Sequence, residues 1–272
     1  MFKTIRNAFK VKELKNKLLY TFMMLVVIRF GSALPIPGVR TDFFANWFAK
    51  QTTDVFGFFN AMTGGSFSQM SIFALSITPY ITSSIIIQLL TIAIPKLEEL
   101  QKDGEDGRKK IQEYTRYVTV GLALIESSAM AIGFGRQGLL ADYNAWNIIV
   151  AIVTMTTGSA LLMWIGEQIT DKGVGNGISI VLLLNILSSV PSDIRNLYFK
   201  FVFGQDIPVA ALRLAIVVLV IVAMVVFVIV LNDAERRIPV QYSKKMVGRK
   251  LVGGQASSIP LKVNTAGVMP VI

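Results

Sequence analysis

The side chains that most often perform catalysis or bind metals are missing from this chain. Its 272 residues include no cysteine and no histidine. A thiolate nucleophile, a disulfide, a Ser-His pair and an imidazole-ligated metal site are therefore excluded as chemistry of this chain. The glycine-rich stretch GEQITDKGVGNGISI (166–180) differs from the G-x-G-x-x-G nucleotide pattern and follows no predicted strand. We interpret it as a tight turn, and we expect neither a cofactor nor enzymatic activity.

Two charged residues, Arg29 and Glu126, lie within otherwise apolar segments. A charge inside a membrane is costly and marks either a functional role or a pairing. One carboxylate cannot form the paired aspartates of an intramembrane protease, but it could couple ion movement to the transport of a solute. For Glu126 we favour a polar contact between helices or with Arg29.

The elements that position these residues are predicted to be membrane-spanning helices. Hydrophobic residues make up 53% of the chain, charged residues 16%, and the mean hydropathy is +0.58. The apolar runs lack the alternation of membrane strands, and lipid cannot satisfy an open backbone. At about 20 residues per crossing, we expect helices near residues 18–35, 70–94, 117–135, 147–165, 178–191 and 212–231, with a seventh beginning near 265. Because the sequence stops soon after that point, we expect a fragment of a longer protein.

Basic residues are concentrated in the N-terminal segment and in the 95–116 and 232–264 loops. The positive-inside rule therefore predicts a cytoplasmic N terminus. The 232–264 loop also mixes its cations with apolar residues, which suits docking to a partner, including one rich in RNA. Docking and simple determination of topology are equally supported by the residues alone.

The stretch SIFALSITPYITSSIIIQLL (71–90) is apolar but contains a proline and several hydroxyl side chains. Taken as a helix, it places Ile77 and Ile81 on one face, and Pro79 is expected to kink it. From the residues alone we favour ordinary packing between membrane helices over a functional role for this pattern. The preceding residues 56–70 are too short to span and are broken by two glycines, so they form either an interfacial or a re-entrant segment.

Long motifs of this sequence resemble the bacterial SecY family, the central subunits of protein-conducting channels. They are SIFALSITPYITSSIIIQLL (71–90), LLMWIGEQITDKGVGNGISI (161–180), LPIPGV (34–39), DGEDGRKKIQEYTRY (103–117) and IPLKVNTAGVMPVI (259–272). The resemblance implies an all-α polytopic membrane protein, an inverted-repeat bundle of which this chain holds the first half and the sixth helix. The implied parts are a basic N-terminal segment (1–17), a five-helix half (18–191), an external loop with the sixth helix (192–231), a basic docking loop (232–264) and the start of a seventh helix (265–272).

The resemblance also implies roles for individual residues. The pore ring would comprise Ile77, Ile81, Leu182, Ile186 and Ile272, with Leu182 standing where isoleucine is commoner. A re-entrant plug at about 56–70 would include Phe58, Phe59, Met62, Gly64 and Gly65. The lateral gate would include Thr82, Gln88 and Glu126, and glutamate is not the residue expected there. The docking loop would use Arg236, Arg237, Lys244, Lys245, Arg249 and Lys250.

The function implied by this resemblance is passage of unfolded polypeptides across the bacterial cytoplasmic membrane and sideways release of apolar helices into lipid. The implied partners are the SecE and SecG subunits, the SecA motor or the ribosome with its RNA, signal sequences, nascent chains and membrane lipid. The alternative function is secondary transport of a small solute, which would depend on Glu126.

Overall fold

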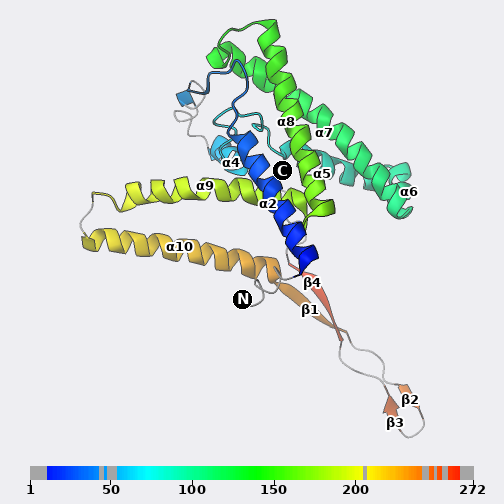
Figure 1. Ribbon diagram of the computed structural model, residues 1–272. Helices are drawn as coiled ribbons and strands as arrows, with labels where there is room; N and C mark the ends of the chain where they lie inside the picture. The colour runs from blue at the N-terminus through cyan, green and yellow to red at the C-terminus, as the bar shows by residue number, and fades with distance from the viewer. Residues whose placement is uncertain are drawn as a thin grey trace. The chain divides into compact units, whose positions relative to one another are not determined.

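The computed structural model describes residues 11–42, 46–47, 54–204, 207–240, 245–247, 250–252 and 257–263. The chain divides into two compact units, Met1–Asp193 and Ile194–Ile272. Each unit is described by itself, and helices dominate the described part of the chain (Figure 1).

The first unit is built from helices joined by short connections and one long irregular segment. Its helices are α2 (Lys12–Ser32), α4 (Asp54–Met62), α5 (Thr78–Ala93), α6 (Pro95–Lys102), α7 (Glu105–Phe134), the π-helical turn η1 (Gly135–Leu139), α8 (Ala145–Lys172) and the larger part of α9 (Gly177–Phe201). Helix α7 packs against α5 and α8, and α2 packs against α8. The glycine-rich stretch is the tight turn that was predicted, because α8 ends at Lys172 and α9 begins at Gly177.

Several of these helices are long and apolar enough to cross a membrane. Within the described residues they are α7 with its π-helical extension, α8, α9 and α10 (Ile207–Asp233). Helices α5 and α6 are bent by 102° at their junction and make a fifth crossing if they are counted together. Helix α2, the first predicted span, is a helix of 21 residues, but five of its residues are charged, including Arg29. Helix α2 is therefore more polar than the membrane-crossing stretches of α7, α8, α9 and α10.

Small and hydroxyl side chains form the contact face of α7. From Thr115 onward its buried residues recur every four positions, namely Thr115, Thr119, Ala123, Ser127 and Ala131. The Thr119 hydroxyl lies 2.5 Å from the Ser83 hydroxyl of α5, and that of Ser127 lies 2.9 Å from the Thr156 hydroxyl of α8. Such residues let membrane helices approach closely and link them through hydrogen bonds.

The predicted helix over 70–94 is wrong at its start, since α5 begins only at Thr78. Residues 63–77 are irregular, and Met70 and Ser76 have positive φ angles of 45° and 53°. Pro79 lies in the first turn of α5, where backbone N–H groups have no helical acceptor, so it does not kink the helix. Pro79 therefore marks the beginning of a helix, whereas from the sequence we expected it to bend one.

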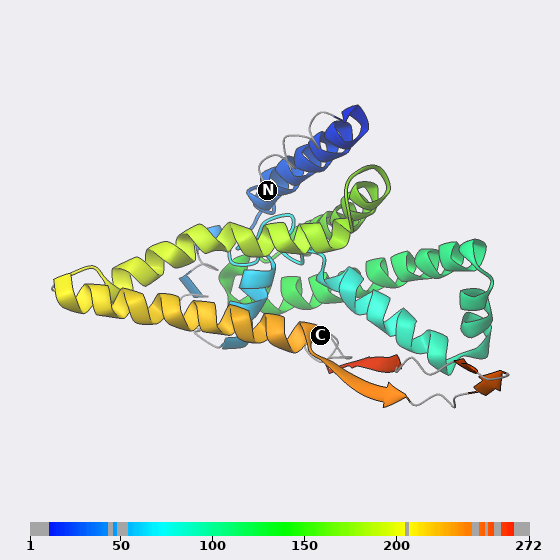
Figure 2. The ribbon, with the colours of Figure 1, turned by 90° about the horizontal axis from the view of Figure 1, so that it is seen from below.

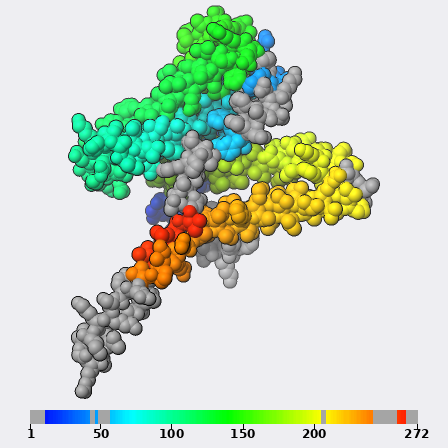
Figure 3. Space-filling view, turned by 180° about the vertical axis from the view of Figure 1, so that it is seen from behind, coloured from blue at the N-terminus to red at the C-terminus, as the bar shows by residue number. Residues whose placement is uncertain are grey.

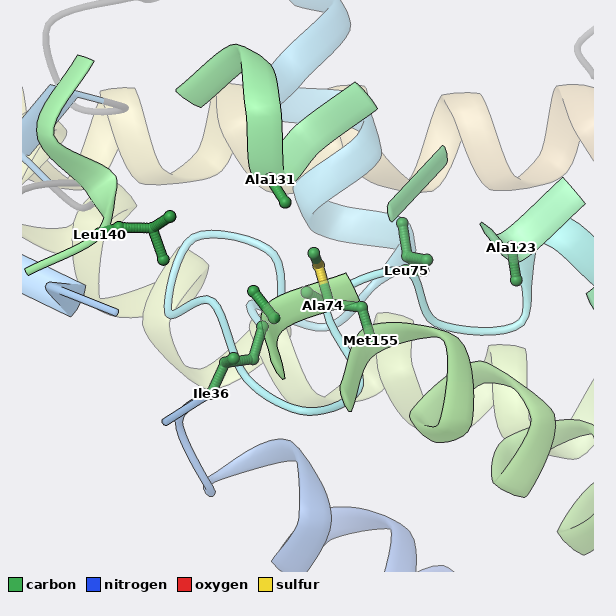
Figure 4. Close-up of a cluster of buried hydrophobic side chains, with 8 residues drawn as sticks. Ile36, Ala74, Leu75, Ala123, Ala131, Leu140 and Met155 are labelled. Atoms are coloured by element: carbon green, nitrogen blue, oxygen red, sulfur yellow. The ribbon is translucent and has the colours of Figure 1, made fainter. Parts of the chain in front are cut away.

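The irregular segment lies at the centre of a buried cluster in the first unit (Figure 4). Ala74 and Leu75 of this segment pack with residues of α7 and α8, the fully buried Ala131 and Met155 among them. Ile36 and Leu140, from the connections after α2 and after η1, join the same cluster. Surrounding helices therefore bury a non-helical backbone, the arrangement that a membrane tolerates.

The second unit contains the end of α9, α10 and two antiparallel ribbons (Figure 2). Strand β1 (Glu235–Val240) pairs with β4 (Ser257–Lys262), and β2 (Lys245–Val247) pairs with β3 (Lys250–Val252). The sequence had indicated only a loop here. Along α10, the large apolar side chains are exposed (Figure 3), as expected of a helix that faces lipid.

Candidate functional site

Three hydrogen bonds fix the irregular segment 63–77 to two of the membrane helices. Asn185 of α9 donates from Nδ2 to the Ser76 hydroxyl over 2.9 Å, and its side chain is buried. Ser188, one turn further along α9, has one hydroxyl proton to share between the Asn185 carbonyl at 2.7 Å and the Gly64 carbonyl at 3.2 Å. Ser159 of α8 donates to the Ser76 carbonyl over 3.2 Å. Both ends of the segment are thus attached to α9.

Gly64 brings the backbone of the segment close to that of α9. Its φ angle is +65°, and a Cβ atom there would lie 2.7 Å from the Asn185 carbonyl oxygen and 2.6 Å from the Ser188 hydroxyl. Any larger residue would be strained and would collide with α9. Gly65 also has a positive φ, +84°, but a Cβ atom there would meet nothing within 4 Å.

The proposed ring residues occupy different environments. Ile77 is completely buried in a cluster that includes Ile28 of α2 and Val181 of α9. Ile81 and Leu182 are half-buried and pack against this same cluster. Ile186 is 46% exposed and lies outside it, and Ile272 lies outside the described residues. The structure therefore brings three of the five side chains together.

The proposed plug residues lie at and after α4. Phe59 makes an edge-to-face contact with Phe67 over 5.1 Å between ring centroids, and Met62 is half-buried. Phe58 is exposed. Residues 54–62 form a short helix, and the chain from Thr63 onward enters the buried interior of the unit. This location fits a re-entrant segment better than an interfacial one.

The proposed gate residues belong to two packed helices. Thr82 of α5 is half-buried, Gln88 of the same helix is exposed, and Glu126 of α7 is half-buried at the wall of a cavity. Arg29 is exposed on α2, and the part of the chain that the structure describes contains no ion pair between it and Glu126. The pairing that the sequence suggested is therefore not formed in the structure.

The proposed docking residues are distributed over the two ribbons. Arg236 and Arg237 are exposed on β1, opposite Leu261 and Pro260 of β4. Lys245 belongs to β2 and Lys250 to β3. Lys244 and Arg249 lie outside the described residues. The described residues contain no cluster of three potential metal ligands.

Sequence reasoning missed the hydrogen-bonding residues of α9 and α8. Asn185 is the only amide in the apolar run ISIVLLLNILSS, and a buried amide in such a run requires a partner. That signal was available. Its partner could not be inferred, because Ser76 is one of many hydroxyl residues and its backbone is not helical.

Together, these features define a polytopic α-helical membrane protein in which packed helices enclose an irregular, hydrogen-bonded segment. A SecY family model matches residues 71–272, and the chain belongs to the SecY family. It is 42% identical over 277 residues to "Protein translocase subunit SecY" of Halalkalibacterium halodurans, covering 100% of this chain and 64% of that protein. The same named protein of Bacillus subtilis is 43% identical over 279 residues, with the same coverage.

The chain therefore spans about two thirds of the length of these relatives, 64% in each case. The fold also resembles a solved structure described as "The structure of a protein conducting channel". The TM-score is 0.52 at 16% sequence identity, and the match covers 91% of this chain and 52% of the other. At that identity the likeness supports the helical fold.

Proposed function

We propose that this chain forms part of a channel that passes unfolded polypeptides across the cytoplasmic membrane and releases apolar helices sideways into lipid. The observation that carries the proposal is the shared apolar cluster of Ile77, Ile81 and Leu182 beside an irregular segment fixed to α9. Relatives named as protein translocase subunits support it over transport of a small solute. The N terminus is cytoplasmic in this proposal, and the chain itself is not catalytic.

The chemistry of the aliphatic cluster suits a constriction for polypeptide. Branched apolar side chains offer a passing chain no hydrogen bond and no charge, so they hold nothing while they exclude water and ions. Ile186 and Ile272 complete the ring in this proposal, and residues 56–70 act as its plug. Thr82, Gln88 and Glu126 line the gate, where polar side chains make the closed contact less stable against an entering apolar helix.

The proposed partners follow from the family and from the charge of the ribbons. SecE and SecG would complete the membrane complex, and the SecA motor or the ribosome would supply the driving energy and the substrate. Exposed Arg236 and Arg237 on β1 support docking of a polyanionic or acidic partner.

The ring is tested by replacing Ile77 and Leu182 with serine in the protein reconstituted with its partners in liposomes. Hydroxyl side chains let water enter the constriction, so ion conductance in the absence of a substrate is expected to rise. Leu183→Ser is the matched control, because Leu183 neighbours Leu182 on α9 but is 55% exposed. Unchanged conductance in the double variant would refute the ring.

A further inference from the structure

A cavity of about 340 Å³ lies between α7 and the segment that runs from α4 to α5. Its volume is within the range of small-molecule binding sites. Its walls are almost entirely apolar and come from elements far apart in the sequence. They consist of Phe59, Phe67, Leu75, Glu126, Ala129, Met130 and Phe134.

Glu126 is the one ionisable side chain among these lining residues. It is half-buried, and no described residue forms an ion pair or a hydrogen bond with its carboxylate. A carboxylate among apolar walls in a membrane-spanning helix is costly unless it takes up a proton or a cation accompanies it, and a cation restores its full hydrogen-bonding capacity as an acceptor. The cavity therefore combines a carboxyl group that has no partner among the described residues with space for one.

The remaining walls specify what kind of cation fits. Three phenyl rings and the Met130 side chain offer apolar contact, and aromatic faces attract an ammonium group electrostatically. A divalent metal ion requires several oxygen ligands, and this cavity supplies one carboxylate. An anion would be repelled, and a neutral apolar molecule would leave Glu126 without a partner.

We propose that this cavity binds a small organic ammonium ion whose positive group pairs with Glu126 and whose aryl-alkyl body lies against the phenyl rings. The site is lined by residues of the proposed plug and gate, not by the Ile77 cluster, and its occupation does not require translocation. A bound molecule would contact both the plug segment, through Phe59 and Phe67, and α7.

The proposal is tested by equilibrium dialysis of radiolabelled 2-phenylethylammonium against the protein in phosphatidylcholine nanodiscs, with empty nanodiscs subtracted. The neutral analogue 2-phenylethanol has the same ring and chain length. The protein should bind the ammonium ion saturably and at least about tenfold more tightly than the alcohol, since a charge-assisted hydrogen bond distinguishes them. Equal binding of the two compounds, or no saturable binding, would overturn the proposal.

Two substitutions separate the roles of charge and space. Glu126→Gln should abolish the preference for the ammonium ion. Ala129→Leu should weaken the binding of both compounds, because the larger side chain fills the cavity. Glu113→Gln is the matched control, because Glu113 is an exposed carboxylate on the same helix outside the cavity. A preference that survives in Glu126→Gln would overturn the assignment of the carboxylate. The comparison of the two compounds on the unaltered protein keeps the test valid if a variant does not fold.

Discussion

Gly64 and Gly65 are adjacent glycines that share a left-handed backbone but differ in their surroundings. Gly64 lies against α9, whereas Gly65 faces open space. Gly64→Ala is expected to lower the free energy of unfolding by about 2–4 kcal/mol, through backbone strain and overlap with Asn185 and Ser188. Gly65→Ala adds only the strain, about 1–2 kcal/mol.

Thermal unfolding of the two detergent-solubilised variants, followed by circular dichroism, checks this difference. Equal losses in the two variants would show that the contact with α9 contributes nothing to stability.

Asn185 donates the buried hydrogen bond that holds Ser76. Asn185→Ala is expected to cost about 1–3 kcal/mol, because the Ser76 hydroxyl loses its partner in a buried place. Hydrogen exchange should rise selectively at amides 63–77. Ser189→Ala is the control, since Ser189 is half-buried and its hydroxyl donates to the Ile186 carbonyl of its own helix. Exchange that stays unchanged in Asn185→Ala would contradict the role of this bond.

Helices α5 and α9 each contain a proline, at positions with opposite consequences. Pro79 lies in the first turn of α5, and Pro191 lies inside α9, where it removes a backbone hydrogen bond. Pro191→Ala is therefore expected to increase the free energy of unfolding by up to about 3 kcal/mol and so to raise the melting temperature. Pro79→Ala should bring no such gain. Calorimetry of both variants checks this, and a comparable gain from Pro79→Ala would indicate a strained α5.

Hydropathy predicted the long apolar helices because each is defined by its own residues. The start of α5 could not be predicted this way, since residues 71–77 are as apolar as the helix that follows. Their irregular backbone depends on hydrogen bonds from Ser159 and Asn185, which are more than 80 positions away. Tertiary contacts therefore decided what local periodicity could not.

The candidate site, like the fold, could be predicted only in part from the sequence. Ile77, Ile81 and Leu182 were named from motifs, and the structure places them in one cluster. The position of Glu126 beside a cavity was not foreseen, because its neighbours Phe59 and Phe67 come from an irregular part of the chain. The ribbons of residues 235–262 were missed because their pairing joins residues such as Arg236 and Leu261 across a long connection.

At the scale of the whole molecule, the positive charge is unevenly distributed, with a net charge of +10. Reversing Arg236 and Arg237 to glutamate should weaken binding of SecA or ribosomes in the proposed channel, most strongly at low salt, because screening weakens such contacts. Replacing Arg195 and Lys200 with glutamate is the control, because it changes the net charge by the same amount on the side predicted to be external. Sedimentation of bound partner at two salt concentrations separates the two variants, and equal losses would argue against docking at β1.

The irregular segment and the α9 residue that binds it contain buried polar atoms that are not satisfied. The hydroxyls of Ser66 and Ser71, and Oδ1 of Asn185, have no hydrogen-bond partner among the residues that the structure describes. Each such atom costs about 1–3 kcal/mol while it stays dry, and contact with water recovers that free energy. In the proposed channel, hydration of this interior would therefore favour displacement of the segment, and an entering polypeptide would have to supply only the remaining free energy.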